Sequence, residues 1–399
     1  MKAFNVNEGV PGFRFAGTLA RIKKTTGKDL GLIVGDGPYT AAGAFTKNRV
    51  KAAPVVLCKK KLQKGFAQAV LVNSGNANAC TGDRGMTDAA SCCRSLAAEA
   101  GIKEGLVLPS STGVIGVPLP AEKIIRALPG LVQKASKSGI ADFASAIMTT
   151  DTFPKIVALE DTVEGKTIKV CGIAKGAGMI MPDMATMLAF IVTDAAVEKR
   201  LLAQLVQQKV EETFNRISVD GDMSTNDSVI VLASGKASKP IAGLRSPGYK
   251  VFSSLLYEVM HRLSGMIVRD GEGATKLITI NVVNARSTGD AKKAALTVAN
   301  SCLVKTAFFG QDYNWGRIMA ALGRSGAYLN MQVVDIYFNG IQGVKNGQGV
   351  QKNIEKLKKA ITKDTIGVVV DLNIGNKSCE ITTCDLSYEY VRINADYTT

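Results

Sequence analysis

The chain has 399 residues, of which 46% are apolar and 21% charged, values typical of a globular protein with about two domains. No apolar run reaches the roughly 18 residues needed to cross a bilayer, and the first eight residues lack the pattern of a secretory signal, so we expect a cytoplasmic protein without a membrane partner. The net charge of +15 raises nucleic-acid binding as a class. However, the basic runs are dispersed and only 6% of the residues are aromatic, which leaves few platforms for stacking bases.

The cysteines and the single histidine limit the chemistry that is available. Eight cysteines include no C-x-x-C pair, and His261 is the one histidine. Zinc sites need closely spaced cysteine or histidine ligands. We therefore expect buried, reduced thiols, no metal site and no bound cofactor. His261 follows Met260 on the predicted inner face of a helix, so we expect it to pack in the core.

The predicted elements alternate between short apolar strands and amphipathic helices, which indicates an α/β fold. In chain order they are strands over 31–34 and 67–72, helices over 84–100 and 121–136, a strand over 187–193, helices over 195–217 and 251–265, and a strand over 275–283. We expect Asp194 to cap the 195–217 helix. From about residue 286 the pattern becomes α+β, with helices over 288–304, 314–324 and 352–362 and strands over 333–338, 367–372 and 379–383. We therefore expect two domains: a layered α/β sandwich over residues 1–285 and a smaller α+β domain over residues 286–399.

A nearly uncharged run rich in glycine and methionine, Lys175 to Met187, contains the strongest candidate for catalysis. Thr186 follows the small residue Ala185, and a hydroxyl on a strained turn can attack its own preceding carbonyl. Hydrolysis of the resulting ester leaves a chain that begins with Thr186. Its α-amine, with a pKa of about 7.7–8.0, can accept the hydroxyl proton. We therefore expect cleavage between Ala185 and Thr186, with Thr186 opening a central strand that faces a cleft.

Other polar segments follow predicted strands. The run over 72–82 carries three asparagines, which suit either a polar turn or a hydrogen-bond network around a site. Thr112 and Gly113 can direct a hydroxyl and a backbone N–H at a developing oxyanion. The run over 218–227 spaces its aspartates like a calcium loop, but its glycine and distal glutamate are misplaced. Residues 165–167, Gly-Lys-Thr, resemble the end of a phosphate-binding loop, but Glu160 stands where its first glycine is needed. The glycine pair at 176 and 178 lacks the third glycine of a dinucleotide-binding loop, because Met181 occupies that position.

Eight segments, spread in order along the whole chain, resemble the ornithine acetyltransferase (glutamate N-acetyltransferase) family of arginine biosynthesis. They are residues 72–82, 111–116, 149–155, 175–190, 218–222, 269–276, 314–318 and 393–397. Each motif is short, but their number and order are specific. Asp183 departs from the family pattern, where asparagine is common, and a carboxylate there could change the pKa of the new α-amine.

The resemblance implies an N-terminal-nucleophile-like, self-processing protein whose two fragments stay together, commonly as an α2β2 heterotetramer. It implies acetyl transfer from N-acetylornithine to glutamate through an ester on Thr186. Some members also accept acetyl-CoA as a substrate. It assigns Thr186 as nucleophile and Thr112 and Gly113 as the oxyanion hole. The implied substrate contacts are Thr149, Thr150, Lys175, Thr186, Glu272, Asn394 and Thr399, which requires the C-terminal tail to return to the site.

Two alternatives remain open from the residues. A self-processed N-terminal-nucleophile amidase or aminopeptidase would use water as the acceptor in place of glutamate. A nucleic-acid-binding protein would instead use the positive charge and would bind in a salt-sensitive manner.

Overall fold

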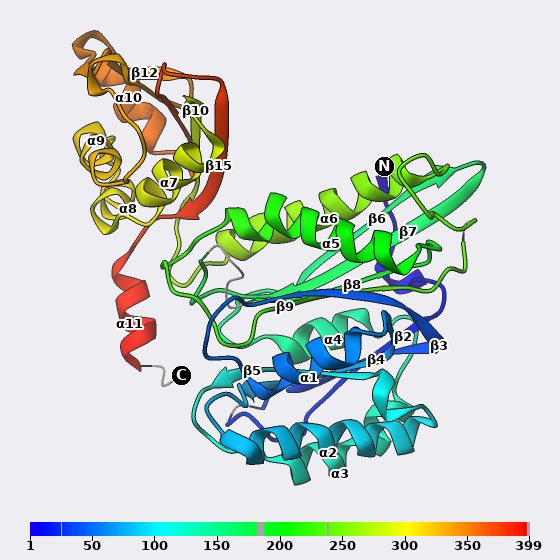
Figure 1. Cartoon of the computed structure of the whole chain (residues 1–399). Coiled ribbons are helices and arrows are strands. Elements are labelled where there is room, and N and C mark those ends of the chain that lie inside the picture. The colour runs from blue at the N-terminus through cyan, green and yellow to red at the C-terminus, as the bar shows by residue number, and fades with distance from the viewer. Residues whose placement is uncertain (25, 182–186, 238, 397–399) are drawn as a thin grey trace.

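The computed structural model describes residues 1–24, 26–181, 187–237 and 239–396. It contains two β-sheets that are covered by helices (Figure 1). In this part of the chain the larger sheet has nine strands in the order β1-β6-β7-β8-β9-β3-β4-β5, with β2 paired to β3. The strands are β1 Lys2–Ala3, β2 Phe13–Thr18, β3 Leu30–Phe45, β4 Phe66–Asn76, β5 Val107–Val114, β6 Lys155–Val163, β7 Lys166–Lys175, β8 Leu188–Thr193 and β9 Ser228–Ala233. The predicted layered α/β architecture is confirmed.

The long strand β3 connects two halves of this sheet. Residues 30–34 of β3 pair with β2 and β4, whereas residues 40–45 pair with β9. The register of the β3–β4 ladder shifts between Val34 and Tyr39, so the strand changes neighbours along its length. The sequence predicted only the apolar start of this strand, because its second half, rich in glycine and alanine, lacks an apolar run.

Helices cover both outer faces of the folded sheet, and α1 and α4 lie between its halves (Figure 1). Their bounds are α1 Ala53–Leu62, α2 Gly82–Ala100, α3 Ala121–Gln133, α4 Ile140–Ile147, α5 Lys199–Glu212 and α6 Tyr249–Arg269. Phe143 of α4 contacts Phe15 of β2 and Phe190 of β8 edge to face, at centroid distances of 6.4 and 5.5 Å. This fully buried aromatic group therefore joins the two halves of the sheet.

Three local expectations were wrong. Helix α5 begins at Lys199 because the Glu198 carboxylate accepts the backbone N–H groups of Arg200 and Leu201. Asp194 is not the cap. Its carboxylate accepts the N–H of Lys169 at 2.7 Å, and burial raises its pKa to about 6.

The predicted 288–304 helix is two helices, α7 Thr288–Ala299 and α8 Cys302–Phe309, because the Ser301 hydroxyl accepts the Val304 N–H and starts the second one. His261 is exposed and stacks on Tyr257. It lies one position, about 100° around the helix, from the buried Met260.

The C-terminal unit contains the second sheet, with strand order β13-β12-β11-β14-β10-β15 among the described residues. Its remaining elements are β10 Leu277–Ala285, α9 Trp315–Gly323, β11 Asp335–Phe338, β12 Ile341–Lys345, β13 Gln348–Gly349, α10 Ile354–Ile361, β14 Thr365–Asp371 and β15 Lys377–Cys384. Strand β10 pairs with β14 and β15. The second sheet thus begins at Leu277, ahead of the boundary expected near residue 285, because strand pairing was not visible in the sequence.

The last helix, α11 Tyr388–Asp396, leaves the second sheet and runs back toward the first unit (Figure 1). The Ser387 hydroxyl donates to the Gly273 carbonyl at 2.6 Å just before this helix begins. No residue of α11 is buried, and Tyr388 is 85% exposed. The helix therefore lies along the surface and is connected to the first unit mainly through polar contacts.

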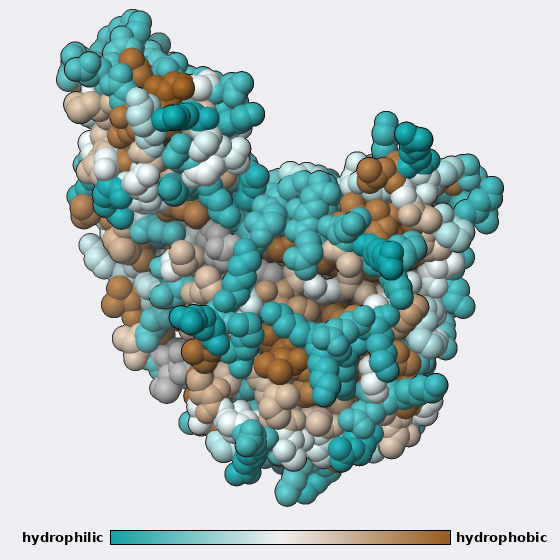
Figure 2. All heavy atoms as spheres, in the orientation of Figure 1, coloured by the Kyte–Doolittle hydropathy of each residue, from teal (hydrophilic) through white to brown (hydrophobic). Residues whose placement is uncertain are grey.

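Figure 2 shows hydrophilic side chains spread over most of one face, with apolar patches between them. No helix in the described residues is both long and apolar enough to span a membrane. Six cysteines are buried, as expected, while Cys80 and Cys302 are exposed.

Candidate active site

A hollow at the carboxyl ends of β4, β5 and β7 brings together residues that are far apart in the sequence. It is lined by Ala77, Thr112, Gly113, Ile115, Thr149, Thr150, Lys175, Gly178, Met179, Ser224, Thr225, Asn226, Glu272 and Asn394. This set includes every predicted site residue that the structure describes. Ala185, Thr186, Asp183 and Thr399 lie outside the described residues, so the predicted cleavage point and tail contact stay predictions.

The strand that follows the predicted cleavage point begins at the hollow. Leu188, the first residue of β8, pairs with Lys175, the last residue of β7. The N–H of Met187 donates to Asp227 Oδ1 at 3.1 Å. Asp227 is fully buried, and burial raises its pKa well above the usual value for a carboxyl. A buried, fixed acceptor thus holds the first described residue after Thr186.

The predicted oxyanion-hole pair lies at the end of β5. Gly113 pairs with Gly75 of β4 and has a φ of +131°, which favours glycine. A Cβ atom at position 113 would lie 2.4 Å from the Gly75 carbonyl carbon and 2.5 Å from the backbone nitrogen of Asn76. The close approach of these two strands therefore requires glycine at position 113.

Buried amide side chains hold the backbone around this pair. Asn226 Nδ2 donates to the carbonyl oxygens of Ser111 and Ala77, at 2.8 and 2.6 Å. The Ser111 hydroxyl donates to Asn73 Oδ1 at 2.6 Å, and Asn73 Nδ2 donates to the Asn76 carbonyl at 2.9 Å. The asparagine-rich run over 72–82 therefore is not a simple polar turn: it forms the end of β4 and the connection to α2, and its amides order the rim of the hollow.

We expect Gly113→Ala to destabilise the protein by at least ~2 kcal/mol, because a positive φ and a backbone clash combine. The matched control is Gly116→Ala, where φ is +80° and a Cβ would meet no atom within 4 Å. Both variants place alanine at a positive φ, but only Gly113→Ala adds a backbone clash. The difference between their thermal unfolding midpoints therefore measures the effect of the clash. Equal unfolding midpoints for the two variants would contradict the required close approach of β4 and β5.

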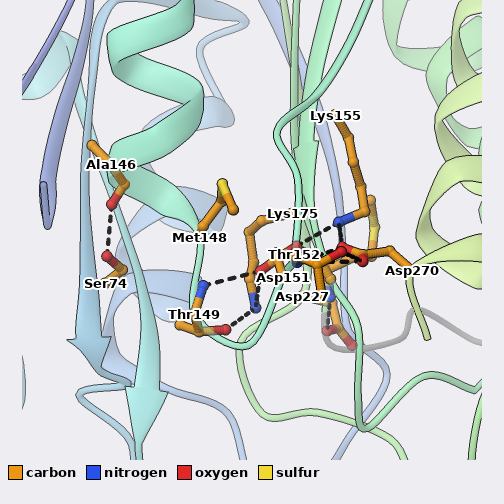
Figure 3. Close-up of polar contacts among 12 residues, drawn as sticks. Ser74, Ala146, Met148, Thr149, Asp151, Thr152, Lys155, Lys175, Asp227 and Asp270 are labelled. Atoms are coloured by element: carbon orange, nitrogen blue, oxygen red, sulfur yellow. Dashed lines mark hydrogen bonds and ion pairs between the residues drawn. The ribbon is translucent and has the colours of Figure 1, made fainter. Parts of the chain in front are cut away.

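Lys175 brings a buried positive charge to the hollow. Its Nζ donates to Thr149 Oγ1 at 2.7 Å and lies 3.8 Å from Asp151 Oδ2 (Figure 3). Burial lowers the pKa of Lys175, and the negative charge of Asp151 opposes this effect. A partly compensated ammonium group of this kind suits a carboxylate ligand.

Glu272 supplies the complementary negative charge. Its backbone N–H donates to the Ala177 carbonyl at 2.9 Å, and its carboxylate lies against Gly178, where a Cβ would come within 2.4 Å of an oxygen. Asn394 Nδ2 of α11 donates to Glu272 Oε2 at 2.9 Å. The expected return of the C-terminal segment to the site is therefore observed as far as Asn394.

Sequence reasoning missed four carboxylates that order this region. Asp220 accepts the N–H groups of Met179 and Ile180 at 2.5 and 2.8 Å, so it fixes the glycine- and methionine-rich run. Asp227, Asp151 and Asp270 hold other segments around the hollow. The sequence analysis identified the run over 218–227 by the spacing of its aspartates, which is similar to that of a calcium loop. This spacing did not indicate that the aspartates accept backbone N–H groups.

Comparison with known proteins gives a consistent result. The model of the ArgJ family matches residues 14–399. The chain is 50% identical to the "Arginine biosynthesis bifunctional protein ArgJ" of Geobacter sulfurreducens, with 98% of this chain and all of the relative covered. It is 47% identical to the protein of the same name from Caldanaerobacter subterraneus, with 97% of each chain covered.

A solved structure of the ArgJ protein of Bacillus halodurans is 39% identical, with a TM-score of 0.50. The match covers 52% of this chain and 98% of that one.

Proposed function

This chain belongs to the ArgJ family, and from that premise we propose that it transfers an acetyl group from N-acetylornithine to glutamate in arginine biosynthesis. The observation that carries the proposal is the hollow at the start of β8, which holds Thr112 and Gly113, the predicted oxyanion-hole pair, together with Lys175 and Glu272. Donors aimed at an oxyanion serve acyl transfer, and a cation and a carboxylate suit the charged groups of an amino acid.

The reaction that fits this arrangement has two halves. Thr186 Oγ attacks the acetyl carbonyl of N-acetylornithine while its own α-amine accepts the hydroxyl proton. The Thr112 hydroxyl and the Gly113 N–H stabilise the tetrahedral oxyanion. Collapse breaks the C–N bond, the proton passes to the leaving amine, and ornithine departs. The amine of glutamate then attacks the acetyl ester, which releases N-acetylglutamate and restores the Thr186 hydroxyl.

The charged residues of the hollow are complementary to the carboxylate and ammonium groups of these substrates. Lys175 and Thr149 present donors to a carboxylate, and Glu272 presents an acceptor to an ammonium group. Thr150 and Asn394 complete the polar lining, and Thr399 is proposed to join them. Both substrates carry a carboxylate, so one binding site serves the two half-reactions in turn.

Cleavage before Thr186, assembly as an α2β2 heterotetramer and a cytoplasmic location belong to the same proposal. The relatives are named bifunctional, which supports acetyl-CoA as a second acetyl donor. The proposal includes no metal and no bound cofactor, since the α-amine serves as base and the oxyanion hole as electrophile.

Formation of N-acetylglutamate tests the proposal directly. We expect product from N-acetylornithine plus glutamate, and, if acetyl-CoA is a donor, from acetyl-CoA plus glutamate. Free acetate formed from N-acetylornithine at the same rate with and without glutamate would indicate an amidase instead. Absence of product with salt-sensitive retention on DNA would indicate a nucleic-acid-binding protein.

A further inference from the structure

Next to Lys175 lies a buried charge cluster that the proposed reaction does not use. Lys155, the first residue of β6, is fully buried. Its Nζ contacts Asp151 Oδ1 at 2.7 Å and Asp270 Oδ2 at 2.5 Å (Figure 3). The Thr152 hydroxyl and backbone N–H also donate to Asp270. With Lys175, the cluster contains two positive and two negative charges.

Asp151 is shared among several donors. Its Oδ1 accepts Lys155 Nζ and the Gly176 N–H, each at 2.7 Å. Its Oδ2 accepts the Thr149 N–H at 3.0 Å and lies 3.8 Å from Lys175 Nζ. Lys175 is therefore the most distant of these partners, and its short hydrogen bond goes to the neutral Thr149 hydroxyl.

The pKa of Asp151 reflects this sharing. Burial alone would raise it, but the charges of Lys175 and Lys155 and the N–H of Gly176 hold it at about 2. Asp151 is thus an anion throughout the neutral range, and most of its hydrogen-bonding capacity is taken by groups other than Lys175.

We propose that Asp151 and Lys155 are positioning residues for Lys175: Asp151 keeps the buried ammonium charged, and Lys155 prevents it from closing into a direct ion pair, so that it remains available to a substrate carboxylate. This inference rests on the proposed function, because it assigns the carboxylate to Lys175. It extends that function by naming two residues that set substrate affinity although neither lines the hollow.

Each charged residue near Lys175 shifts the pKa of its ammonium group in a definite direction. Asp151, Glu272 and Asp227 each favour the charged ammonium, whereas Lys155 disfavours it. Lys23, which donates to the Met148 carbonyl at 2.5 Å, is a further positive group within electrostatic range. Loss of Asp151 lowers the pKa of Lys175, and loss of Lys155 raises it.

The test is the pH profile of kcat/KM for glutamate, measured as the ratio of each variant to wild type so that titration of the substrate cancels. Lys175 binds carboxylate in its protonated form, so activity falls as pH rises through its pKa. We expect Asp151→Asn to move this alkaline limb to lower pH by about one unit or more, a typical effect of removing an opposite charge within 4–6 Å. Lys155→Met should move it to higher pH and raise KM for glutamate.

Asp270→Asn is the matched control. It removes the other carboxylate that contacts Lys155, from the same buried cluster, but it does not act on Lys175 directly. We expect its alkaline limb to coincide with that of wild type. If the three substitutions only disturbed the packing of the site, the alkaline limbs of all three pH profiles would move in the same direction. Shifts in opposite directions for Asp151→Asn and Lys155→Met therefore distinguish a positioning role from a structural one.

Two outcomes overturn the inference: unchanged limbs in folded Asp151→Asn and Lys155→Met proteins, or equal shifts in Asp151→Asn and Asp270→Asn. If one variant does not fold, the sign of the other still decides. Wild-type protein that makes no N-acetylglutamate would overturn the proposed function itself. Active wild type with unshifted variants would overturn only the roles of Asp151 and Lys155.

Discussion

Replacing Thr186 by alanine is expected to abolish both cleavage of the chain and acetyl transfer, because the substitution removes the one hydroxyl proposed for both steps. On a denaturing gel the variant should run as a single band of 42.1 kDa, whereas cleavage after residue 185 gives fragments of about 19 and about 23 kDa. Loss of a catalytic nucleophile lowers kcat by about 10⁴-fold or more in comparable enzymes.

The serine variant provides the control for this prediction. Thr186→Ser keeps the hydroxyl and, after cleavage, the α-amine, so it should retain part of both activities. N-terminal sequencing of the larger wild-type fragment, which begins at residue 186, should read Thr-Met-Leu-Ala. Cleaved, active Thr186→Ala protein would contradict the assignment.

The second large effect is expected at Lys175. Lys175→Met removes the buried ammonium while keeping most of the aliphatic volume. Loss of one partner of a buried charged contact costs about 2–5 kcal/mol, which corresponds to a decrease of about 30-fold to several thousand-fold in kcat/KM for glutamate. The decrease should appear with N-acetylornithine as well, because both substrates carry a carboxylate.

Lys169→Met is the matched control for Lys175→Met. Lys169 lies on the same strand β7, but its Nζ pairs with Glu8 at 2.7 Å, and it does not line the hollow. The same substitution there should leave kcat/KM within about twofold, as expected for a partly exposed ion pair. Unchanged steady-state constants in cleaved, folded Lys175→Met protein would show that the carboxylate binds elsewhere.

Local sequence patterns predicted the elements whose burial is one-sided. The helices near 84–100 and 251–265 have an apolar stripe and a polar face, and they were found close to their observed bounds. Helix α4 was missed because its eight residues span only about two turns. Although Asp142 and Ser145 form an exposed polar side, so short a segment repeats its apolar stripe too few times for the period to be recognised.

The same limit applies to the site. Thr112, Lys175 and Glu272 were named on resemblance, and the hollow brings them together. Only half of the ion cluster could be seen in the sequence: Asp151 and Lys155 are four residues apart, but Asp270 reaches them from the end of α6, more than one hundred residues later. A contact of that kind depends on the packing of α6 across the sheet, which no local motif records.

The strand order has a mechanical consequence for a chain that is cut before residue 186. Strands β8 and β9, which follow the cut, are inserted between β7 on one side and β3 on the other, both of which precede it. Breaking one peptide bond would therefore leave two polypeptides interleaved within a single hydrogen-bonded ladder. They could separate only if the sheet itself unfolded, so the severed pieces should co-elute in native buffer and part only in denaturant.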